Sequence, residues 1–237
     1  MTDFSNRKIL VLGGSRGIGA AIVRRFAADG ATVTFSYAGS IDAAEALAAE
    51  TGATAVQADS ADRAALTAAV AAQGPLDVLV INAGVVQFGD PLELEADAID
   101  RMIDINVRAP YHAAVAAART MVDGGRIMVI GSNAADRVPF GGIAAYAMTK
   151  AAMQGMVRGL ARDFGARGIT VNSVQPGPTD SDMNPASGPM AEMMHSFMAI
   201  KRHGRAEEVA GMVAWLAGPE AGFVTGAMHT IDGAFGA

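Results

Sequence analysis

The stretch Ile9-Leu-Val-Leu-Gly-Gly-Ser-Arg-Gly-Ile-Gly19 decides the fold of this chain. Its first four residues are all apolar, as in a strand that is buried on both faces of a sheet. The run from Ile18 to Ala28 has the apolar spacing of a helix, and Gly30 closes it. A strand that leads through glycines directly into a helix predicts the first unit of a βα series.

The glycine-rich turn is suited to binding phosphate. Its glycines let the turn stay tight, the backbone approach a pyrophosphate, and the helix pack closely on the strand. The free N–H groups at the helix N-terminus then face the anion. Glycines also occur in purely structural turns, but this turn lies between a strand and a helix, which favours a nucleotide site. The predicted contacts are Gly13, Ser15, Arg16, Gly17, Ile18 and Gly19.

Short apolar runs alternate with longer Ala-rich amphipathic stretches along the whole chain. Strands are expected over residues 9–12, 32–37, 53–58, 78–81, 126–130, 170–174 and 228–231. Helices are expected over residues 18–28, 41–50, 61–73, 98–121, 143–165 and 207–216. Repeated alternation produces right-handed crossovers and one parallel sheet between helices. The predicted fold class is therefore α/β: a single doubly wound Rossmann domain over residues 1–237, with a seven-stranded parallel sheet and helices on both faces.

Composition limits the classes of function. The 237 residues are 51% hydrophobic and 18% charged, which excludes a disordered chain. Cysteine is absent, which excludes disulfide scaffolds, Cys-ligated zinc and thiolate catalysis. A net charge of −6 without a basic block argues against binding to nucleic-acid polymers or membranes. Because the chain shows neither a signal-peptide core nor a membrane-spanning run, a cytoplasmic protein is expected.

The segment after the second expected strand indicates which dinucleotide binds. An NAD site usually has an acidic residue about 20 residues after the turn, which holds the ribose hydroxyls. Here the segment reads Ser36-Tyr-Ala-Gly-Ser40, and the first acid is Asp42. Arg16 is placed to meet a 2′-phosphate instead, so NADP(H) is the predicted cofactor, with Tyr37 and Ser40 beside it. The alternatives are that Arg16 is a solvated loop charge, or that Ser36, Tyr37 or Ser40 binds an unphosphorylated ribose.

Two further turns follow strands at the same edge of the predicted sheet. Asp59, with Ser60 next to it, could accept a hydrogen bond from an adenine amino group. The alternative is that Asp59 or Ser60 caps the next helix, a role that both residue types favour. Asn82-Ala83-Gly84 is a turn by composition, and only its position after the fourth strand predicts that it lies near the cofactor.

Tyr146-Ala-Met-Thr-Lys150 is the most specific local signal. A spacing of four residues places the phenol and the ammonium on one face of a helix. A neighbouring cation favours the phenolate and lowers the pKa of the tyrosine, which suits proton transfer near neutral pH. The chain has only three tyrosines and three lysines, so this spacing rarely arises by chance. A purely structural pair is the alternative.

Two other polar residues stand at chemically useful places. Ser132 follows the fifth strand, where its hydroxyl could donate to a carbonyl oxygen that becomes an alkoxide. Asn106 lies inside an expected helix, where asparagine is unfavourable, so it could bond backbone and hold a water of a proton relay. Taken singly, each also fits a structural role. The histidines share no motif, and neither cysteine nor an H-x-x-x-H spacing is present, so no metal site is expected.

Together these features resemble the short-chain dehydrogenase/reductase family over essentially the whole chain. The resemblance rests on residues 13–19, Asp59, Asn82-Ala-Gly84, Asn106, Ser132, Tyr146-x-x-x-Lys150, Pro176-Gly177, residues 205–209, Thr225-Gly226 and Asp232-Gly233. It is strongest for the branch of 3-oxoacyl-acyl-carrier-protein reductases, which use NADPH.

The resemblance implies a role for each matched residue. Tyr146 would be the general acid for carbonyl reduction, and Ser132 would orient and polarise the carbonyl. Lys150 would bind the nicotinamide ribose and lower the pKa of Tyr146, while Asn106 would hold the relay water. It also implies a homotetramer formed through two long helices and the C-terminal strand. Further cofactor contacts implied are Tyr146, Lys150, Pro176, Gly177, Thr179 and Ser181.

A second resemblance, within the family, concerns a member that binds cyclic di-GMP and acts in biofilm dispersal. It rests on residues 13–25, Asp163-Phe-Gly with Gly168-Ile-Thr, and residues 198–237. It implies the alternative function of a regulator that sequesters cyclic di-GMP on a reductase scaffold. Arg101-Met-Ile-Asp104 has the R-x-x-D spacing of some cyclic-dinucleotide sites, but this spacing is common by chance.

A short substrate lid is expected at about residues 183–204. Its methionines suit an adaptable apolar pocket wall; the alternative is that Met190, Met193, Met194 and Met198 form one face of a helix. A basic cluster follows, which could receive a phosphate-bearing arm or be a solvated rim; it consists of His195, Lys201, Arg202, His203 and Arg205. The carbonyl substrate itself is not predicted.

Overall fold

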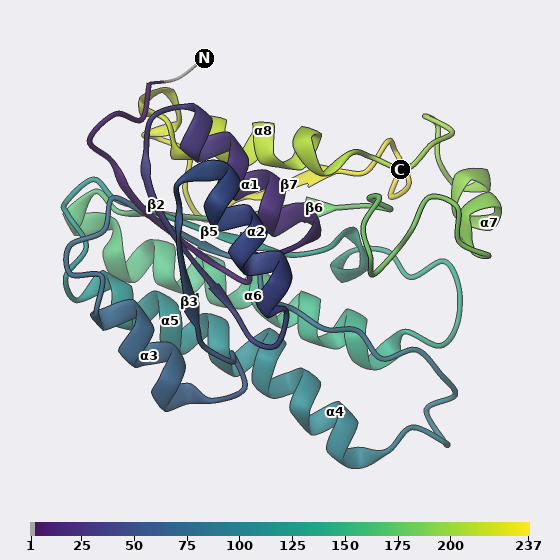
Figure 1. Cartoon of the computed structure of the whole chain (residues 1–237). Helices are drawn as coiled ribbons and strands as arrows, with labels where there is room; N and C mark the ends of the chain where they lie inside the picture. The colour runs from purple at the N-terminus through teal and green to yellow at the C-terminus, as the bar shows by residue number, and fades with distance from the viewer. Residues whose placement is uncertain (1–2) are drawn as a thin grey trace.

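The computed structural model describes residues 3–237 and confirms the predicted sheet (Figure 1). Met1 and Thr2 of the predicted domain lie outside the described residues. Seven parallel strands are arranged in the order β3-β2-β1-β4-β5-β6-β7. Their bounds are β1 Lys8–Leu12, β2 Thr32–Tyr37, β3 Thr54–Gln57, β4 Val78–Ile81, β5 Arg126–Ile130, β6 Thr170–Pro176 and β7 Met228–Ile231.

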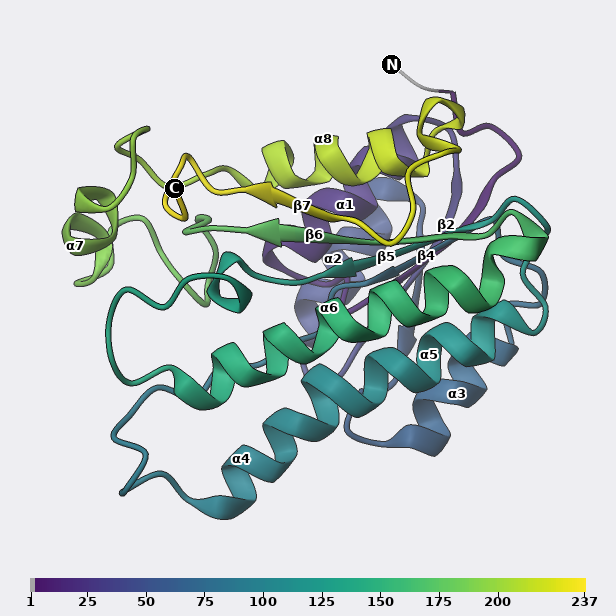
Figure 2. The ribbon, with the colours of Figure 1, turned by 180° about the vertical axis from the view of Figure 1, so that it is seen from behind.

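Helices cover both faces of this sheet, as Figures 1 and 2 show. On one face pack α1 (Gly17–Ala28), α2 (Ile41–Thr51) and α8 (Ala206–Ala217). On the other pack α3 (Arg63–Ala71), α5 (Ala109–Ala118) and α6 (Ala144–Phe164). Alternate residues of β1 enter the two cores, because successive side chains of a strand point to opposite faces: Ile9 and Val11 join one, Leu10 and Leu12 the other.

One expected helix, over residues 98–121, is divided in the structure. It consists of α4 (Ala96–Ile103), a π-helical turn at Asp104–Arg108, and α5. Asn106 lies in that turn, is fully buried, and bonds a neighbouring loop through its side chain. π-Turns inside helices often accompany functional sites. The prediction of a continuous α-helix was wrong. The spacing of apolar residues does not show that one turn of the helix contains an extra residue, as the π-helical turn does.

The glycine-rich turn lies where the strand order reverses, between β1 and β4. The carboxyl ends of the strands meet at this edge, and Figure 2 shows β6 and β7 pointing toward α7 (Ala191–Ser196) and the C-terminus. Ligands of open α/β sheets bind in such a crevice. None of the helices in residues 3–237 is both long enough and apolar enough to cross a membrane.

The segment predicted as a lid folds back over this edge. Its base is closed by a bridge between Thr179 and Gly204, with Gly204 N donating to Pro178 O at 2.9 Å. Only the middle of the segment is helical, so the proposed single helix face is not formed. Met194 and Met198 are buried against Phe235, whereas Met190 is 42% exposed and lies outside α7.

Candidate active site

The glycine-rich turn has the geometry expected from its residues. Gly13 and Gly17 have φ angles of +76° and +51°, which side chains other than glycine rarely adopt. A Cβ on Gly19 would lie 2.1 Å from the carbonyl oxygen of Gly13, so the helix could not approach the strand. α1 starts without a side-chain cap among the described residues. Its first N–H groups therefore stay available to an anion.

Asn82 connects the turn to the end of β4. Its Nδ2 donates to Gly13 O at 2.6 Å, and a Cβ on Gly13 would lie 2.7 Å from the Cα of Ala83. Asn82, Ala83 and Gly84 thus pack directly beside the glycine-rich turn. The segment follows β4, as predicted, and its contact with the cofactor stays a prediction.

A single cleft of about 940 Å³ brings most of the predicted residues together. It runs along the carboxyl edge of the sheet, from the glycine-rich turn to the lid. The predicted residues that line it are Gly13, Ser15, Arg16, Gly17, Ile18, Tyr37, Ser40, Asp59, Ser60, Asn82, Ala83, Gly84, Ser132, Tyr146, Lys150, Pro176, Gly177, Thr179 and Ser181. Gly19 and Asn106 lie behind this lining, where they support the turn and a neighbouring loop.

Arg16 bridges the two sides of the cleft. Its Nη1 lies 3.2 Å from Asp182 Oδ2 on the lid segment, and both side chains are more than half exposed. Such an exposed pair is weak, of about 0–1 kcal/mol. Arg16 is therefore able to exchange Asp182 for an anion of a ligand in the cleft.

Asp59 faces the cleft but does not cap a helix. Its Oδ1 accepts from Ala61 N at 2.9 Å, and its Oδ2 accepts from Arg101 Nη2 at 3.0 Å. Asp62 caps α3 instead, accepting from two backbone N–H groups. The alternative that Asp59 or Ser60 is the cap was wrong, because α3 begins two residues later than expected. The hydrogen bond from Ala61 and the contact with Arg101 hold the pKa of Asp59 below its ordinary value.

Arg101 and Asp104 do not act as one R-x-x-D unit. Arg101 pairs with Asp59 across the cleft, whereas Asp104 pairs with Arg108 one turn along the helix. The two side chains of the motif are thus engaged with different partners.

Ser132, Tyr146 and Lys150 meet at the inner end of the cleft. Ser132 precedes the turn Asn133–Ala135 and accepts from Ala134 N through its hydroxyl at 3.1 Å. Lys150 is buried, donates to Ile130 O at 3.1 Å, and lies 5.6 Å from the ring centre of Tyr146. α6 therefore presents the ammonium to the end of β5 and the phenol to Ser132 in the turn that follows.

Burial changes the acidity of this pair. Burial raises the pKa of Tyr146, and a hydrogen bond with Ser132 opposes that rise. Burial also lowers the pKa of Lys150 to about 8. The role of Lys150 in lowering the pKa of Tyr146 stays a prediction.

Asn106 fastens the loop after β4 to α6. Its Oδ1 accepts from Val85 N at 2.9 Å, and its Nδ2 donates to Val85 O at 2.8 Å and to Thr149 Oγ1 at 3.1 Å. The prediction that it bonds backbone is confirmed. Its role in holding a relay water stays a prediction.

The predicted basic cluster is divided among several contacts. Arg202 makes paired hydrogen bonds to Glu208, and Arg205 lies near the same carboxylate. His203 is buried rather than part of a solvated rim, and its Nδ1 lies 2.7 Å from Nε2 of His195. The arginine charges are therefore balanced within the protein.

Sequence reasoning missed several residues of the cleft. Arg101 was noted only as part of a motif. Met183, Met190 and Met194 of the predicted lid line the cleft, as the apolar-wall hypothesis expects, but the apolar lining from outside the lid was not predicted. Within the described residues this lining includes Val86, Phe88, Pro139, Phe140, Ile143 and Phe235, together with Arg137. These residues carry no local motif, because they come from loops that meet only in the folded chain.

Comparisons with known proteins agree with this geometry. Residues 13–235 match the family model described as Enoyl-(Acyl carrier protein) reductase. The cyclic-di-GMP-binding biofilm dispersal mediator protein of Escherichia coli (strain K12) is 68% identical over 237 residues, which is 100% of both chains. The 3-oxoacyl-(acyl-carrier-protein) reductase MabA of Mycobacterium bovis is 36% identical over 236 residues, covering 98% of this chain and 94% of the relative. A crystal structure of BdcA in complex with NADPH has a TM-score of 0.98 at 69% identity, covering 99% of this chain and 96% of that one.

Proposed function

The chain belongs to the short-chain dehydrogenase/reductase family, and we propose that it is an NADP(H)-dependent oxidoreductase that reduces a carbonyl to an alcohol. The observation that carries the proposal is that Ser132, Tyr146 and Lys150 line the same cleft as the glycine-rich turn. NADPH, the ligand of the similar BdcA structure, is the cofactor that the sequence predicts.

The cleft fits NADP(H) along its length. The uncapped start of α1 suits the pyrophosphate, and Arg16 suits the 2′-phosphate. Asp59 lines the cleft, and its carboxylate suits the adenine amino group. Lys150 suits the nicotinamide ribose at the inner end. When bound, the reduced cofactor supplies a hydride to a carbonyl carbon.

The protein's own residues supply the proton and the polarisation. The hydroxyl of Ser132 holds the substrate oxygen, where negative charge develops. Tyr146 is protonated at neutral pH, as tyrosines ordinarily are, and it donates its proton to that oxygen. The Lys150 ammonium next to the ring then stabilises the phenolate that remains. Asn106 holds the loop that forms this end of the cleft.

The test is NADPH oxidation with a panel of ketones, aldehydes and 3-oxoacyl thioesters. We expect turnover of at least one compound, followed as loss of absorbance of the reduced cofactor. Tight NADPH binding without turnover of any compound would contradict the proposal.

That negative result would favour a second function, binding of cyclic di-GMP. The observation behind it is the name of the relative that is 68% identical over its full length. In this case calorimetric titration with cyclic di-GMP should show saturable binding, with cyclic di-AMP as the matched control. Because Asp59 and Arg101 already face the cleft, saturation with NADPH should be tested as a competitor.

Arg16 is expected to decide the preference for NADPH. Arg16→Ala should weaken NADPH binding by about 10- to 100-fold, since a hydrogen-bonded charge pair with the 2′-phosphate is lost. NADH binding should change little, as it lacks this phosphate. The matched control is Arg24→Ala on α1, which breaks a similar exposed pair with Glu50 of α2. Equal losses for NADPH and NADH would contradict the assignment.

We also propose a cytoplasmic homotetramer. Exposed apolar side chains occur at the surfaces that such an assembly uses by family resemblance. Tyr111 on α5 and Met148 on α6, the two long helices of the prediction, are about half exposed. Burial of these side chains against copies of the chain would remove them from water.

A further inference from the structure

The arginines that line the cleft are paired with carboxylates, with one exception. Among residues 3–237, four cations and two acids line the cleft: Arg16, Arg101, Arg137 and Lys150, and Asp59 and Asp182. Arg16 pairs with Asp182 and Arg101 pairs with Asp59. Both pairs and Lys150 belong to the part of the cleft that we assign to the cofactor. Arg137 is the cation that remains at the substrate end.

Arg137 is fixed between the turn that carries Ser132 and the C-terminal segment. Its backbone N donates to the carbonyl oxygen of Asn133, the residue after Ser132, at 3.0 Å. Its Nη1 donates to the backbone oxygens of Phe235 and Ala237, each at 2.7 Å. The guanidinium is therefore held in one place before a ligand arrives.

These bonds leave one edge of the guanidinium open. A guanidinium has five N–H donors, and three of them belong to Nε and Nη2. In the described part of the chain neither nitrogen of Arg137 donates to a protein acceptor, and neither is a buried atom without a partner, so both are accessible. The Nε–H and one Nη2–H point in the same direction, as in the paired hydrogen bonds that arginine makes to a carboxylate or a phosphate.

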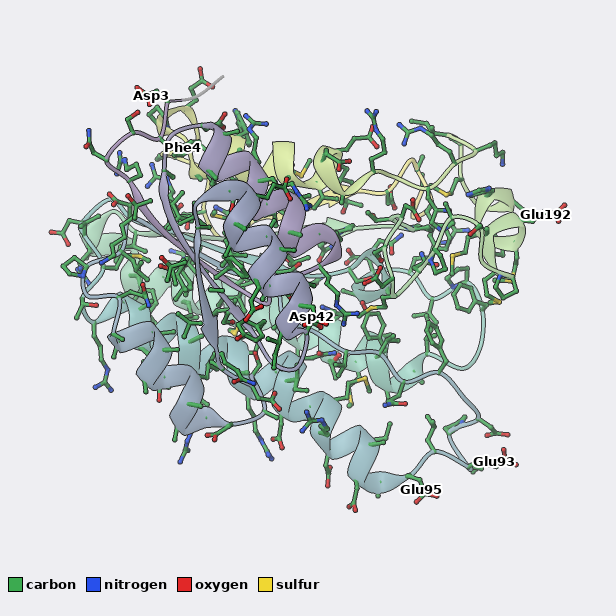
Figure 3. All side chains as sticks on the ribbon, in the orientation of Figure 1. Asp3, Phe4, Asp42, Glu93, Glu95 and Glu192 are labelled. Atoms are coloured by element: carbon green, nitrogen blue, oxygen red, sulfur yellow. The ribbon has the colours of Figure 1, made fainter. Side chains whose placement is uncertain are left out.

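The acids around Arg137 leave its charge unpaired. Asp136 accepts hydrogen bonds from two glutamine side chains, and Asp232 accepts from two backbone N–H groups. Three exposed acids of the surrounding segments do not line the cleft, and Figure 3 shows them on the outside of the molecule: Glu93, Glu95 and Glu192. The positive charge is thus available to a ligand.

The rest of the lining at the substrate end is mainly apolar. It includes Val86, Phe88, Pro139, Phe140, Ile143, Met190, Met194 and Phe235. Phe235 is buried, and its ring centre lies 5.7 Å from that of Phe197 on the lid. An anion in such surroundings loses water at a cost in free energy, and hydrogen bonds from Arg137 would offset this cost.

We propose that Arg137 determines substrate specificity by binding an anionic group, a carboxylate or a phosphate, of a carbonyl compound with an apolar body. The open edge of its guanidinium holds the anion, while the carbonyl lies at Ser132 and Tyr146. The proposal rests on the proposed reductase function and names the group that the substrate carries besides its carbonyl.

The test compares substrates that differ in charge. The carboxylate series runs from 4-oxopentanoate to 8-oxononanoate, each beside its methyl ester. The phosphate pair is dihydroxyacetone phosphate and dihydroxyacetone. We expect at least one anion to have a kcat/KM about 10- to 100-fold above that of its neutral partner, as hydrogen bonds to a charged group contribute. The pair with the largest ratio identifies the anion, and absence of such a ratio from every pair would overturn the proposal.

Arg137→Gln should remove this preference. We expect the ratio of the two kcat/KM values to fall to about one, through a higher KM for the anion, because the lost contact binds substrate and transition state alike. Loosening of the C-terminal segment acts on both members of a pair, so the ratio reports the charge. Arg137→Lys, which keeps the charge, should retain part of the preference.

The control is Arg119→Gln, since Arg119 is exposed and outside the cleft. This variant should keep the full wild-type ratio. An Arg137→Gln enzyme with the wild-type ratio would show that another group binds the anion.

Failure of the reductase function is distinguishable from failure of this proposal. If no ketone, aldehyde or thioester is reduced, the reductase function fails, and Arg137 is tested by calorimetric titration of the NADP⁺-saturated protein with each anion and its neutral partner. Tighter binding of an anion that is lost in Arg137→Gln supports the proposal. Binding that does not distinguish the two members of any pair, or no binding of any anion, overturns it.

Discussion

Tyr146→Phe is expected to lower the rate of NADPH-dependent carbonyl reduction by about 10²–10⁴-fold, the usual contribution of a positioned general acid. The substitution removes one oxygen and leaves the ring beside Lys150. NADPH binding should therefore persist, as measured by the fluorescence of the bound cofactor. The loss should appear in kcat and in kcat/KM together, because the missing proton transfer belongs to the transition state.

The control for this variant is Tyr111→Phe. Tyr111 lies on the surface of α5, is 49% exposed, and does not line the cleft. The Tyr111→Phe enzyme should retain the wild-type rate with the same substrate. A Tyr146→Phe enzyme with unchanged kcat would show that the proton comes from another group.

Lys150→Met is expected to abolish reduction and yet stabilise the folded protein at neutral pH. The ammonium is buried, and burial lowers its pKa from 10.5 to about 8. This difference corresponds to about 3 kcal/mol. Loss of the hydrogen bond to Ile130 O offsets part of the gain. We therefore expect the free energy of unfolding at pH 7 to rise by about 1–3 kcal/mol.

The sign of the pH dependence follows from the two pKa values. Below pH 8 both the folded and the unfolded wild type hold the proton, so the full cost of burying the charge lowers the free energy of unfolding. Between pH 8 and 10.5 the unfolded chain binds more protons than the folded protein, so the stability of the wild type rises with pH. The advantage of Lys150→Met should shrink through that window. Denaturant titrations at several pH values measure it.

Lys201→Met is the control, since Lys201 is exposed and outside the cleft. It should leave the stability near that of the wild type at each pH. A Lys150→Met protein that is less stable than the wild type at pH 7 would show that the hydrogen bond outweighs the buried charge.

Local spacing is sufficient to predict residues that share a turn or a helix face. Tyr146 and Lys150 are four residues apart, so any helix places them together. Gly13 and Gly19 belong to one turn, whose tight geometry requires both. These parts of the candidate site could be predicted because their neighbours in space are also neighbours in the chain.

Local spacing was insufficient where several residues compete for one role. Asp59, Ser60 and Asp62 are all good helix caps, and their preferences differ little in energy. In the folded protein Arg101, from a distant helix, contacts Asp59, and α3 begins after Asp62. A contact between segments of this kind leaves no mark in the local pattern.

Residue patterns were enough to predict the order of the seven strands, the parallel sheet, the tight glycine-rich turn and the tyrosine–lysine pair. These features depend on side-chain periodicity and on the conformational freedom of glycine, which are properties of short segments. Only the tertiary structure decided that Arg137 is held by the C-terminal segment, that Asn106 ties a loop to α6, and that Lys150 is buried. Hydrogen-bond partners and solvation depend on distances between segments remote in the chain, which the sequence pattern does not contain.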